Sequence, residues 1–395
     1  MIYLDNAATT KIDPAVVTAM TPYLMEEYGN AGTLYPLGSR ARLAVDRARE
    51  QVAAFLGAEN PDQVVFTSGG SESNNMVFNH HGIFGFKANK NYVVTSPIEH
   101  DSILKSAEML KSVWGFNIIY TAVNSDGIVD LNSFEDVVDA NADSISLASV
   151  MHSNNEVGSV NDIKAMADIC SWYGIPFHTD CVQSASFENI KASMIGCDYI
   201  SVSSHKIHGP KGVGALYIKD RSLFSPMIYG GKSQEFGLRG GTENVAGIVG
   251  FGKACELMVN GLCNNEPQYV TSLKQEFYDN LTVFMKDNDI ENKLHVNARS
   301  DTSFGKILSL RFDEIDAETM VLMLGERGVC VAAGSACTSR EQKPSHVLSA
   351  IGIDDDSARE TIRVSFSRMN TKDEVYDAAR IVADTASFLY NIRKA

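Results

Sequence analysis

The feature that most limits the fold of this chain is an alternation of strand-like and helical segments between residues 42 and 220. Short apolar runs, such as residues 64–67 and 92–95, are separated by stretches whose apolar residues recur every three or four positions. This pattern is typical of βαβ units, in which helices join parallel strands and cover both faces of a sheet. The sequence therefore predicts an α/β fold with a mostly parallel sheet.

The predicted elements fall into two groups. In the first, strands at 64–67, 92–95, 117–120 and 146–150 alternate with helices at 42–56, 101–113, 131–139 and 162–173. The second follows a loop-rich stretch at 221–241 and a mostly helical stretch at 243–288, and has strands at 307–312, 329–332 and 361–366. A terminal helix opens with the capping-box pattern Thr371-Lys372-Asp373-Glu374. The second group predicts a smaller α/β unit.

A chain of 395 residues exceeds the size at which a single core keeps growing, so two domains are expected. We assign residues 14–255 to a large domain, and residues 1–13 with 256–395 to a small domain. The sequence has no repeat, low-complexity tract or flexible linker. A helix is therefore expected to join the two domains.

Composition excludes several functional classes. The net charge of −15 argues against direct nucleic-acid binding, which needs a basic face. Residues 1–5 show no secretory signal, and no uncharged apolar run of about 18 residues offers a membrane span. The seven cysteines lack metal-ligand or disulfide spacing, so no metal is expected. A cytoplasmic protein without membrane contact is predicted.

Asp180 and Lys206 are the two residues that most directly indicate a cofactor. Each follows an apolar run, and the carboxyl ends of strands in an open α/β sheet form a crevice where functional groups gather. A lysine can form a Schiff base with pyridoxal phosphate, and a carboxylate can keep the pyridine nitrogen protonated. Either charge alone is typical of a solvated loop. Together, and with His205 and Gln183 close by in sequence, they predict a pyridoxal-phosphate site.

A glycine-rich turn follows the first predicted strand, in the stretch Thr67-Ser68-Gly69-Gly70-Ser71-Glu72-Ser73. Glycines let the backbone approach an anion, and a helix that begins near Ser71 would offer unpaired N–H groups to a phosphate. The same residues also fit a plain strand-to-helix turn. The turn is not a Walker loop, because the GK[ST] ending is missing.

Two further loops follow predicted strands. His100, preceded by Glu99, could stack on a flat cofactor and move protons, although a lone histidine is more often structural. The loop at 151–158 contains Asn154 and Asn155, which could cap the next segment or bind a cofactor oxygen and a substrate carboxylate.

Two residues of the second group carry candidate chemistry. Cys337 lies among small residues, in Gly334-Ser335-Ala336-Cys337-Thr338-Ser339, so we expect an accessible thiol that could act as a nucleophile. Burial is the alternative for any single cysteine. Arg363 lies inside an apolar strand, where a guanidinium needs an anionic partner, and a substrate carboxylate fits its fork.

These residues, taken together, resemble a known family. The motifs that carry the resemblance are His178-Thr179-Asp180, Ser203-Ser204-His205-Lys206, Arg239-Gly240-Gly241-Thr242 and Gly334-Ser335-Ala336-Cys337. They resemble those of the NifS/IscS-type cysteine desulfurases, in the class V aminotransferase group of pyridoxal-phosphate enzymes. The resemblance runs nearly end to end. It implies a fold-type I enzyme, with a mostly parallel seven-stranded sheet, helices on both faces and a smaller α/β domain.

The resemblance also implies cofactor contacts. Lys206 would hold pyridoxal 5'-phosphate covalently, and Asp180 would pair with the ring nitrogen. Gln183 and Asn155 would approach the ring hydroxyl. The phosphate would be held by Gly70, Ser71, Ser203 and His205, with Thr242 reaching across from the second subunit of a homodimer.

For the reaction, the resemblance implies conversion of L-cysteine to L-alanine. His100 would stack on the ring and move protons, and Arg363 with Asn155 would bind the substrate carboxylate. Cys337 would take the sulfur as a persulfide and pass it to an acceptor protein, in iron–sulfur cluster assembly or a thiolation pathway. The acceptor's identity is not readable from the sequence.

The chain departs from the family pattern at three places. Residues 30–35 lack a proline and a histidine that relatives commonly carry, Gly70 replaces a common alanine, and Cys181 replaces another beside Asp180. Selenocysteine lyase or another pyridoxal-phosphate amino-acid enzyme stays an alternative. A catalytically idle binding protein, or a metal hydrolase built on His178 and Asp180, fits the motifs less well.

Overall fold

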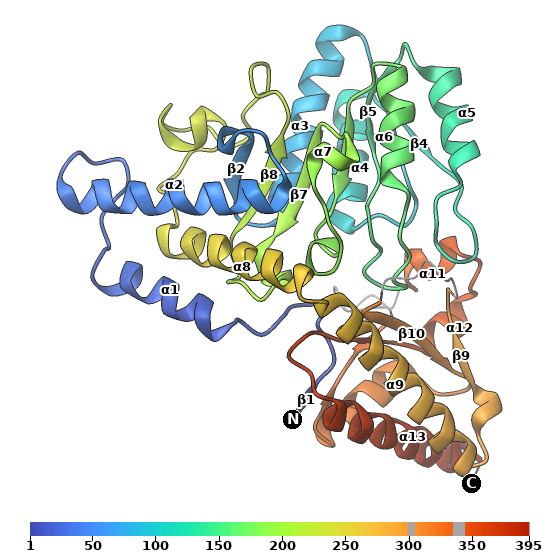
Figure 1. The fold of residues 1–395 in the computed structure, drawn as a ribbon. Helices are drawn as coiled ribbons and strands as arrows, with labels where there is room; N and C mark the ends of the chain where they lie inside the picture. Colours follow the sequence, from blue (N-terminus) through green and yellow to red (C-terminus); the bar gives the residue numbers. More distant parts are fainter. Residues whose placement is uncertain (299–304, 335–343, 395) are drawn as a thin grey trace.

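The computed structural model describes residues 1–298, 305–334 and 344–394, and a seven-stranded sheet forms its centre (Figure 1). The sheet order is β2-β8-β7-β6-β5-β3-β4. Its strands are β2 (Val64–Thr67), β3 (Tyr92–Thr95), β4 (Asn117–Tyr120), β5 (Ile145–Ser149), β6 (Phe177–Asp180), β7 (Tyr199–Ser203) and β8 (Gly214–Ile218). Only β8 runs antiparallel to its neighbours. The mostly parallel sheet predicted from the alternation is confirmed.

Helices cover both faces of this sheet because successive strand residues point to opposite sides. Val93 packs with α3 (Gly70–Ala88) and α4 (Asp101–Trp114), whereas the next residue, Val94, packs in the core of the other face. That other face is covered by α2 (Pro36–Leu56), α5 (Leu131–Asn141), α6 (Ile163–Trp172), α7 (Ala192–Ile195) and α8 (Val245–Cys263). The sheet is therefore buried on both sides.

Helix α8 is the most apolar helix of this layer. An 18-residue window in it, Val245–Leu262, is long and apolar enough to cross a membrane by composition, and 56% of that window is buried inside the protein. Phe251 and Cys255 belong to the core beneath the sheet, and the helix also carries Lys253 and Glu256. These features are those of a core helix of a globular domain.

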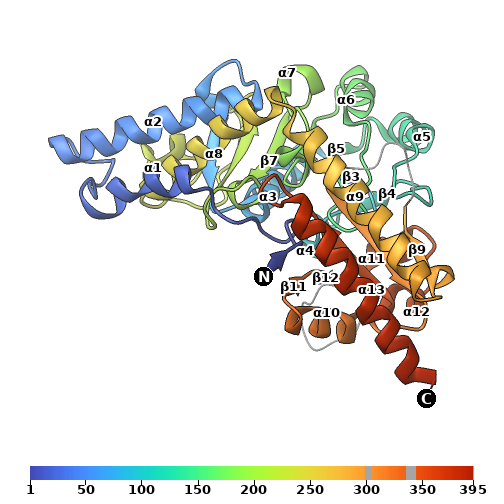
Figure 2. The same ribbon diagram turned by 60° about the horizontal axis from the view of Figure 1, so that its bottom comes forward.

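A second sheet, of four antiparallel strands in the order β12-β13-β10-β9, forms the lower layer in Figure 1. Its strands are β9 (Leu294–Val296), β10 (Ile307–Phe312), β12 (Ala332–Ala333) and β13 (Thr361–Ser365). Its helices are α9 (Glu266–Asp287), α10 (Ala317–Glu326), α11 (His346–Ala350), α12 (Asp355–Arg359) and α13 (Lys372–Lys394). The long helices α9 and α13 lie side by side (Figure 2). This unit has its own hydrophobic core.

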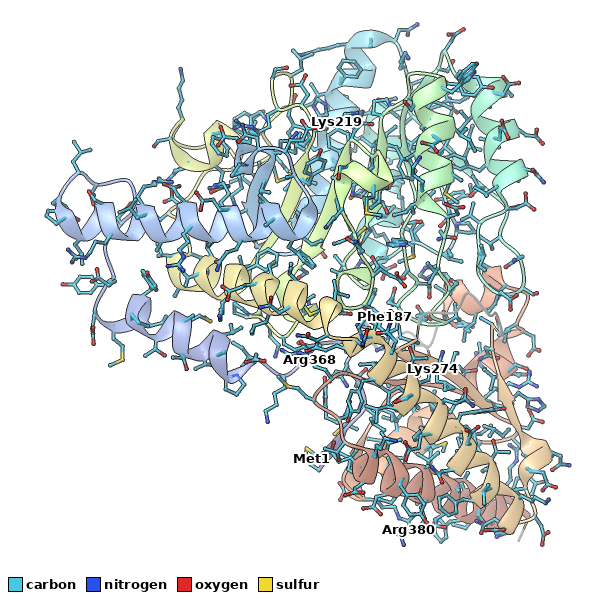
Figure 3. All side chains as sticks on the ribbon, in the orientation of Figure 1. Met1, Phe187, Lys219, Lys274, Arg368 and Arg380 are labelled. Atoms are coloured by element: carbon cyan, nitrogen blue, oxygen red, sulfur yellow. The ribbon has the colours of Figure 1, made fainter. Side chains whose placement is uncertain are left out.

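The N-terminal segment joins this second unit. Strand β1 (Ile2–Tyr3) pairs in parallel with β11 (Val329–Cys330), and Leu4 is buried in the second core. The change from the first core to the second falls between α8 and α9. Phe187 and Arg368 lie at the junction of the two units (Figure 3). The domain boundary at residue 255 stays a prediction.

The elements agree with the sequence patterns except at a few places. The capping box at Thr371 is confirmed, because Thr371 N donates to Glu374 Oε2 (3.1 Å) and Glu374 N to Thr371 Oγ1 (3.2 Å). The strand predicted at 329–332 is two short strands, β11 and β12, in different sheets. Helix α1 (Pro14–Met25) was not predicted, because proline opens it and a second proline lies inside it.

Candidate active site

Asp180 and Lys206 lie at one edge of the central sheet. Asp180 is the last residue of β6, which runs parallel to β7 and pairs its Asp180 with Ser201. Lys206 ends the short 3-10 helix η3 (Ser204–Lys206), directly after β7. The predicted placement of both residues at the carboxyl ends of neighbouring strands is confirmed.

The Asp180 carboxylate is buried and held in a fixed orientation. Asn74 Nδ2 donates to Oδ2 (2.7 Å), and the Val182 N–H donates to Oδ1 (2.9 Å). Each oxygen keeps a further lone pair, so the carboxylate can accept another hydrogen bond from a ligand. Asn74, in α3, was not identified from the sequence.

His100 belongs to the same hydrogen-bond network. Asn74 Nδ2 also donates to Ser102 Oγ (2.9 Å), and Ser102 Oγ lies 2.8 Å from His100 Nδ1. His100 caps α4, because its Nδ1 accepts from the Ser102 N–H (3.1 Å). The neutral ring therefore carries its proton on Nε2. The ring is exposed, which leaves Nε2 free to exchange a proton with a bound molecule.

The Lys206 amine lies between this sheet edge and the N-terminal segment. Its Nζ donates to the carbonyl oxygens of Ala7 (2.5 Å) and Ala8 (2.9 Å). Burial, together with the positive charge of Arg363, lowers the Lys206 pKa to about 8, against the opposing effect of Asp180. About a tenth of the amine is thus uncharged at pH 7, and more at higher pH, in the form that a nucleophile or base requires.

The predicted phosphate-binding residues form a cradle at the start of α3. Gly69, the N-cap of this helix, has a φ of +152°, and a Cβ on Gly214 would lie 2.7 Å from the Gly69 Cα. Glycine is therefore needed at both positions, and the open N–H groups of α3 are left accessible. Ser203, the last residue of β7, lies against this helix start, and His205 follows it two residues later in η3.

His205 is neutral at physiological pH. Its Nδ1 lies 3.1 Å from Thr9 Oγ1. Burial and the charges of Lys206 and Lys211 lower its pKa to about 4. A neutral imidazole can still donate one hydrogen bond to a phosphate.

The structure explains the departure at Gly70. A Cβ on Gly70 would lie 2.5 Å from Val182 Cγ2, so the valine side chain fills the space that an alanine would need. Cys181, the other departure beside Asp180, is fully buried, and burial raises the pKa of its thiol to about 12. Cys181 is therefore unsuited to act as a nucleophile.

Arg363 reaches the site from β13 of the second unit. Its Nη1 donates to the carbonyl oxygen of Asn155 (2.9 Å), and its Nη2 forms an ion pair with Asp5 Oδ1 (2.9 Å). The prediction that this buried arginine has an anionic partner is confirmed, and in this structure the partner is Asp5. Gln183 lies nearby, because its Nε2 donates to the Ala7 carbonyl (2.8 Å) that Lys206 also contacts.

Cys337 lies outside the described residues, but the two flanks of its segment are described. Upstream, the Gly334 N–H donates to the Thr361 carbonyl (2.7 Å), two residues before Arg363. Downstream, Ser345 Oγ donates to the Glu156 carboxylate, and His346 Nε2 to the Glu99 carbonyl (2.9 Å). Glu156 follows Asn155 and Glu99 precedes His100, so both flanks lie against the candidate site.

Thr242 is not part of this cluster within one chain. It is exposed, in the loop before α8. Its predicted contact depends on a second subunit and stays a prediction.

The alternative of a metal site at His178 is not supported. His178 is buried between Ser149 Oγ (2.8 Å) and Ser201 Oγ (3.0 Å), and burial lowers its pKa to about 3. Within the described ranges, no three His, Cys, Asp or Glu residues are grouped as metal ligands would be. His178 therefore has a structural role between two strands.

Glu99 is a buried acid that the sequence did not mark as unusual. Its Oε1 accepts from Ser96 Oγ (2.5 Å) and from the Met151 N–H (2.9 Å), and burial raises its pKa to about 8. The folded-state pKa exceeds the ordinary 4.5, so the contribution of Glu99 to stability is full below that value and is lost as pH rises towards 8.

Glu99→Gln mimics the protonated acid and is expected to become more stable relative to the wild type as pH rises from about 5 to about 8. Thermal melts of both proteins across this range measure the difference. The exposed Glu50→Gln is the matched control, with no pH-dependent difference expected. A Glu99→Gln difference that is constant with pH would contradict the raised pKa.

The residues fit pyridoxal phosphate. The α3 cradle suits its phosphate, Asp180 a protonated ring nitrogen, and Lys206 its aldehyde. Gln183 Oε1 and Asn74 Oδ1 are buried without hydrogen-bond partners among the residues the structure describes. Such orphaned acceptors are uncommon in folded proteins and are consistent with a polar ligand beside them.

Sequence reasoning missed Asn74 and Asp5 as site residues. Nothing in the local sequence marks Asp5 as the partner of Arg363. Asn74 lies one turn after the glycine-rich turn. It is fully buried, but α3 is only weakly amphipathic, so the local sequence carries no clear signal for that burial.

Comparisons with known proteins agree with this geometry. The profile of the family described as "Aminotransferase class-V" matches residues 2–377. The cysteine desulfurase IscS of Dictyoglomus turgidum is 37% identical over 375 residues, which cover 95% of this chain and 91% of that protein. A solved structure described as a NifS-like protein superposes with a TM-score of 0.88 at 33% identity, covering 98% of this chain and 100% of the other.

A second solved structure, described as SspA in complex with cysteine, has a TM-score of 0.78 and 31% identity, with 94% of this chain and 100% of the other covered. The family match extends over nearly the whole chain, and the relatives are matched along almost their full length. The protein therefore belongs to the class-V aminotransferase family and, within it, to the cysteine desulfurases.

Proposed function

We propose that this enzyme uses pyridoxal phosphate to convert L-cysteine to L-alanine and takes the sulfur onto Cys337 as a persulfide. The observation that carries the proposal is the meeting of Lys206, Asp180, His100 and Arg363 at one sheet edge, between the two flanks of the Cys337 segment. The relatives named cysteine desulfurase, and the similar structure described as SspA in complex with cysteine, support it.

Bound pyridoxal phosphate would act as an electron sink for the carbon that loses its proton. Lys206 would hold the cofactor and Asp180 its ring nitrogen, with Asn74 and Val182 fixing the carboxylate. Gly70, Ser71, Ser203 and His205 would hold the phosphate, and Gln183 and Asn155 the ring hydroxyl. The neutral state of His205 suits a donor that must not also compete for a proton.

Substrate binding would depend on Arg363. Its guanidinium is oriented by the Asn155 carbonyl and Asp5, so a substrate carboxylate meets a preformed fork. The uncharged Lys206 amine would take the Cα proton, which its pKa of about 8 permits near neutral pH. His100 Nε2 would hold or deliver the proton that the thiol chemistry requires.

The sulfur transfer balances without an external oxidant. The Cys337 thiolate forms an S–S bond to the substrate sulfur as the S–Cβ bond breaks, and the carbon keeps the electron pair. That carbon then takes a proton, and Lys206 would return a proton to Cα, which completes L-alanine. The persulfide can then pass its outer sulfur to an acceptor protein, and the names of the relatives favour iron–sulfur assembly.

The test is a direct assay. Purified protein supplied with pyridoxal phosphate and L-cysteine should release L-alanine and gain one sulfur on Cys337, as seen by peptide mass spectrometry. L-Selenocysteine is the comparison substrate, because the fold also suits a lyase for it. Release of pyruvate or a keto acid in place of alanine would overturn the proposal.

We also propose that the enzyme is a cytoplasmic homodimer. Apolar side chains are exposed along α1, the loop after it and the start of α2, at the end of the molecule away from the second unit (Figure 1): Leu24, Met25, Tyr28, Leu34, Tyr35 and Leu43. Leu34 alone is 98% exposed. A second copy would cover this face and bring its Thr242 to the phosphate cradle. Sedimentation velocity tests the stoichiometry.

A further inference from the structure

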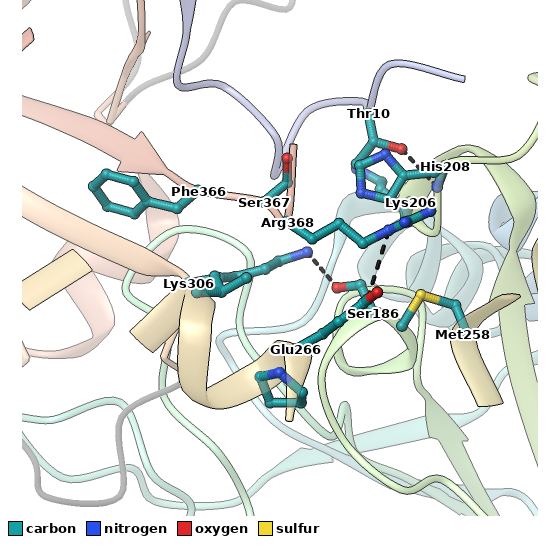
Figure 4. A pocket seen from close by; sticks show the side chains of 12 residues that line it. Thr10, Ser186, Lys206, His208, Met258, Glu266, Lys306, Phe366, Ser367 and Arg368 are labelled. Atoms are coloured by element: carbon teal, nitrogen blue, oxygen red, sulfur yellow. Dashed lines mark hydrogen bonds and ion pairs between the residues drawn. The ribbon is translucent and has the colours of Figure 1, made fainter. Parts of the chain in front are cut away.

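A cavity of mixed polar and apolar lining lies at the junction of the two units, on the side of Lys206 that faces the second unit (Figure 4). Its walls include Thr10, Ser186, Lys206, Lys306 and Arg368. Lys306 comes from the residue just before β10, and nothing in the cofactor chemistry described above uses it. The cavity thus brings a second buried lysine beside the candidate cofactor lysine.

Lys306 is 3% exposed and held in place by hydrogen bonding. Its Nζ donates to Ser186 Oγ (2.5 Å), and Ser186 Oγ donates to the carbonyl oxygen of Gln183 (3.0 Å). Gln183 Nε2 and Lys206 Nζ both donate to the Ala7 carbonyl. The two amines therefore both lie next to Gln183, Lys306 through Ser186 on its backbone carbonyl and Lys206 through the Ala7 carbonyl that its side chain also contacts.

Among the described residues, the charged groups near Lys306 are Lys206, Arg363, Arg368 and the anionic Glu266. Arg363 of β13 and Lys206 both act on it, and Arg368 also lines the cavity. The Arg368 charge is balanced by Asp13 (2.6 Å) and Glu266 (3.6 Å).

His208, which also lines the cavity, has a pKa lowered to about 4, chiefly by burial, and is neutral. Burial, followed by the charges of Lys206 and Arg363, lowers the Lys306 pKa to about 7.

We propose that Lys306 is a positioning residue that shares one proton with Lys206 across this cavity, and thereby keeps the Lys206 amine uncharged for part of the time. Two ammonium groups in one poorly hydrated cavity repel each other, so the second proton binds more weakly than the first. The proposal rests on the proposed function only for the role of Lys206 in catalysis.

The shared proton would affect catalysis when the Lys206 amine is free to act as a base. A proton that would otherwise remain on Lys206 can move to Lys306, which leaves Lys206 able to take the Cα proton. A permanent charge at position 306 should lower the Lys206 pKa, and an uncharged side chain should raise it.

The test uses full-length, cofactor-free protein, in which the Lys206 amine is free. Brief acetylation at a series of pH values, followed by peptide mass spectrometry, gives the titration midpoint of each lysine. Relative to the wild type, Lys306→Met should raise the Lys206 midpoint by a few tenths of a pH unit. Lys306→Arg should lower it by about one unit. Lys274→Met is the control, because Lys274 is a largely buried lysine of α9 that does not line the cavity.

The reciprocal variant gives an independent measurement. Because coupling between two sites is mutual, Lys206→Met should raise the Lys306 midpoint from about 7 by up to about one unit. If Lys306→Met does not fold, the separate variants Lys206→Met and Lys306→Gln test the proposal in its place. In the holoenzyme, the acid limb of the kcat profile should move to lower pH in Lys306→Arg and to higher pH in Lys306→Met.

Equal Lys206 midpoints in the wild type, Lys306→Met and Lys306→Arg, with a Lys306 midpoint unaffected by Lys206→Met, would overturn the proposal. The outcome does not depend on desulfurase activity. Coupled midpoints in a protein that releases no alanine would contradict the proposed function alone.

Discussion

Cys337→Ser is expected to lose protein persulfide completely and to slow alanine release by about 1000-fold or more, the scale seen when an enzyme loses its nucleophile. The serine hydroxyl cannot attack sulfur usefully, because it is not ionised near neutral pH and an S–O bond is a poor product. Cofactor binding should be unchanged, since Lys206, Asp180 and the α3 cradle are untouched. Alanine release, absorbance of the bound cofactor and peptide mass spectrometry measure the three effects.

Cys181→Ser and Cys330→Ser are the controls. Cys181 is fully buried beside Asp180, and Cys330 lies in β11, so neither is expected to carry the extra sulfur. A persulfide on Cys181, or undiminished alanine release by Cys337→Ser, would show that the sulfur does not pass through Cys337.

Lys206→Met is expected to reduce turnover by a comparable factor, through loss of both the covalent cofactor link and the base that removes the Cα proton. Borohydride reduction of the wild type should leave the pyridoxyl group on the peptide that contains Lys206. Methionine keeps much of the length and apolar volume of the lysine stem, so folding should be retained.

Lys211→Met is the matched control, because Lys211 is an exposed lysine only five residues further on. It should retain cofactor and activity. Recovery of the pyridoxyl group on Lys211, or a wild-type cofactor spectrum in Lys206→Met after reduction, would show that another lysine holds the cofactor.

The site residues that could be predicted from the sequence are those that a local sequence pattern marks. Asp180 and Lys206 each follow an apolar run, and a parallel sheet places the ends of such runs at one edge. The α3 cradle is equally local, because glycines next to a helix start are read within seven residues.

The contacts that the sequence did not reveal join distant parts of the chain. Asp5 meets Arg363 across 358 positions, and Lys306 meets Ser186 across 120. No periodicity, motif or turn signal in the sequence predicts either contact. Arg363 was predicted to need an anion, but it is the bridge between Asp5 and Ser365 of β13 that brings Asp5 to it. Asn74 was missed for a related reason, since its partner Asp180 is 106 positions away.

The attachment of the N-terminal segment to the second unit also bears on how the chain folds during synthesis. Ile2 pairs with Val329, and the Leu4 carbonyl accepts from the Ser365 N–H, so these N-terminal residues find their partners only after residue 365 has left the ribosome. Until then the Lys206 amine lacks its hydrogen bonds to the carbonyl oxygens of Ala7 and Ala8. The central sheet can form early, since domains fold as their residues emerge, but the catalytic pocket closes last. A nascent chain of this enzyme should therefore capture its cofactor only after residue 365 has emerged.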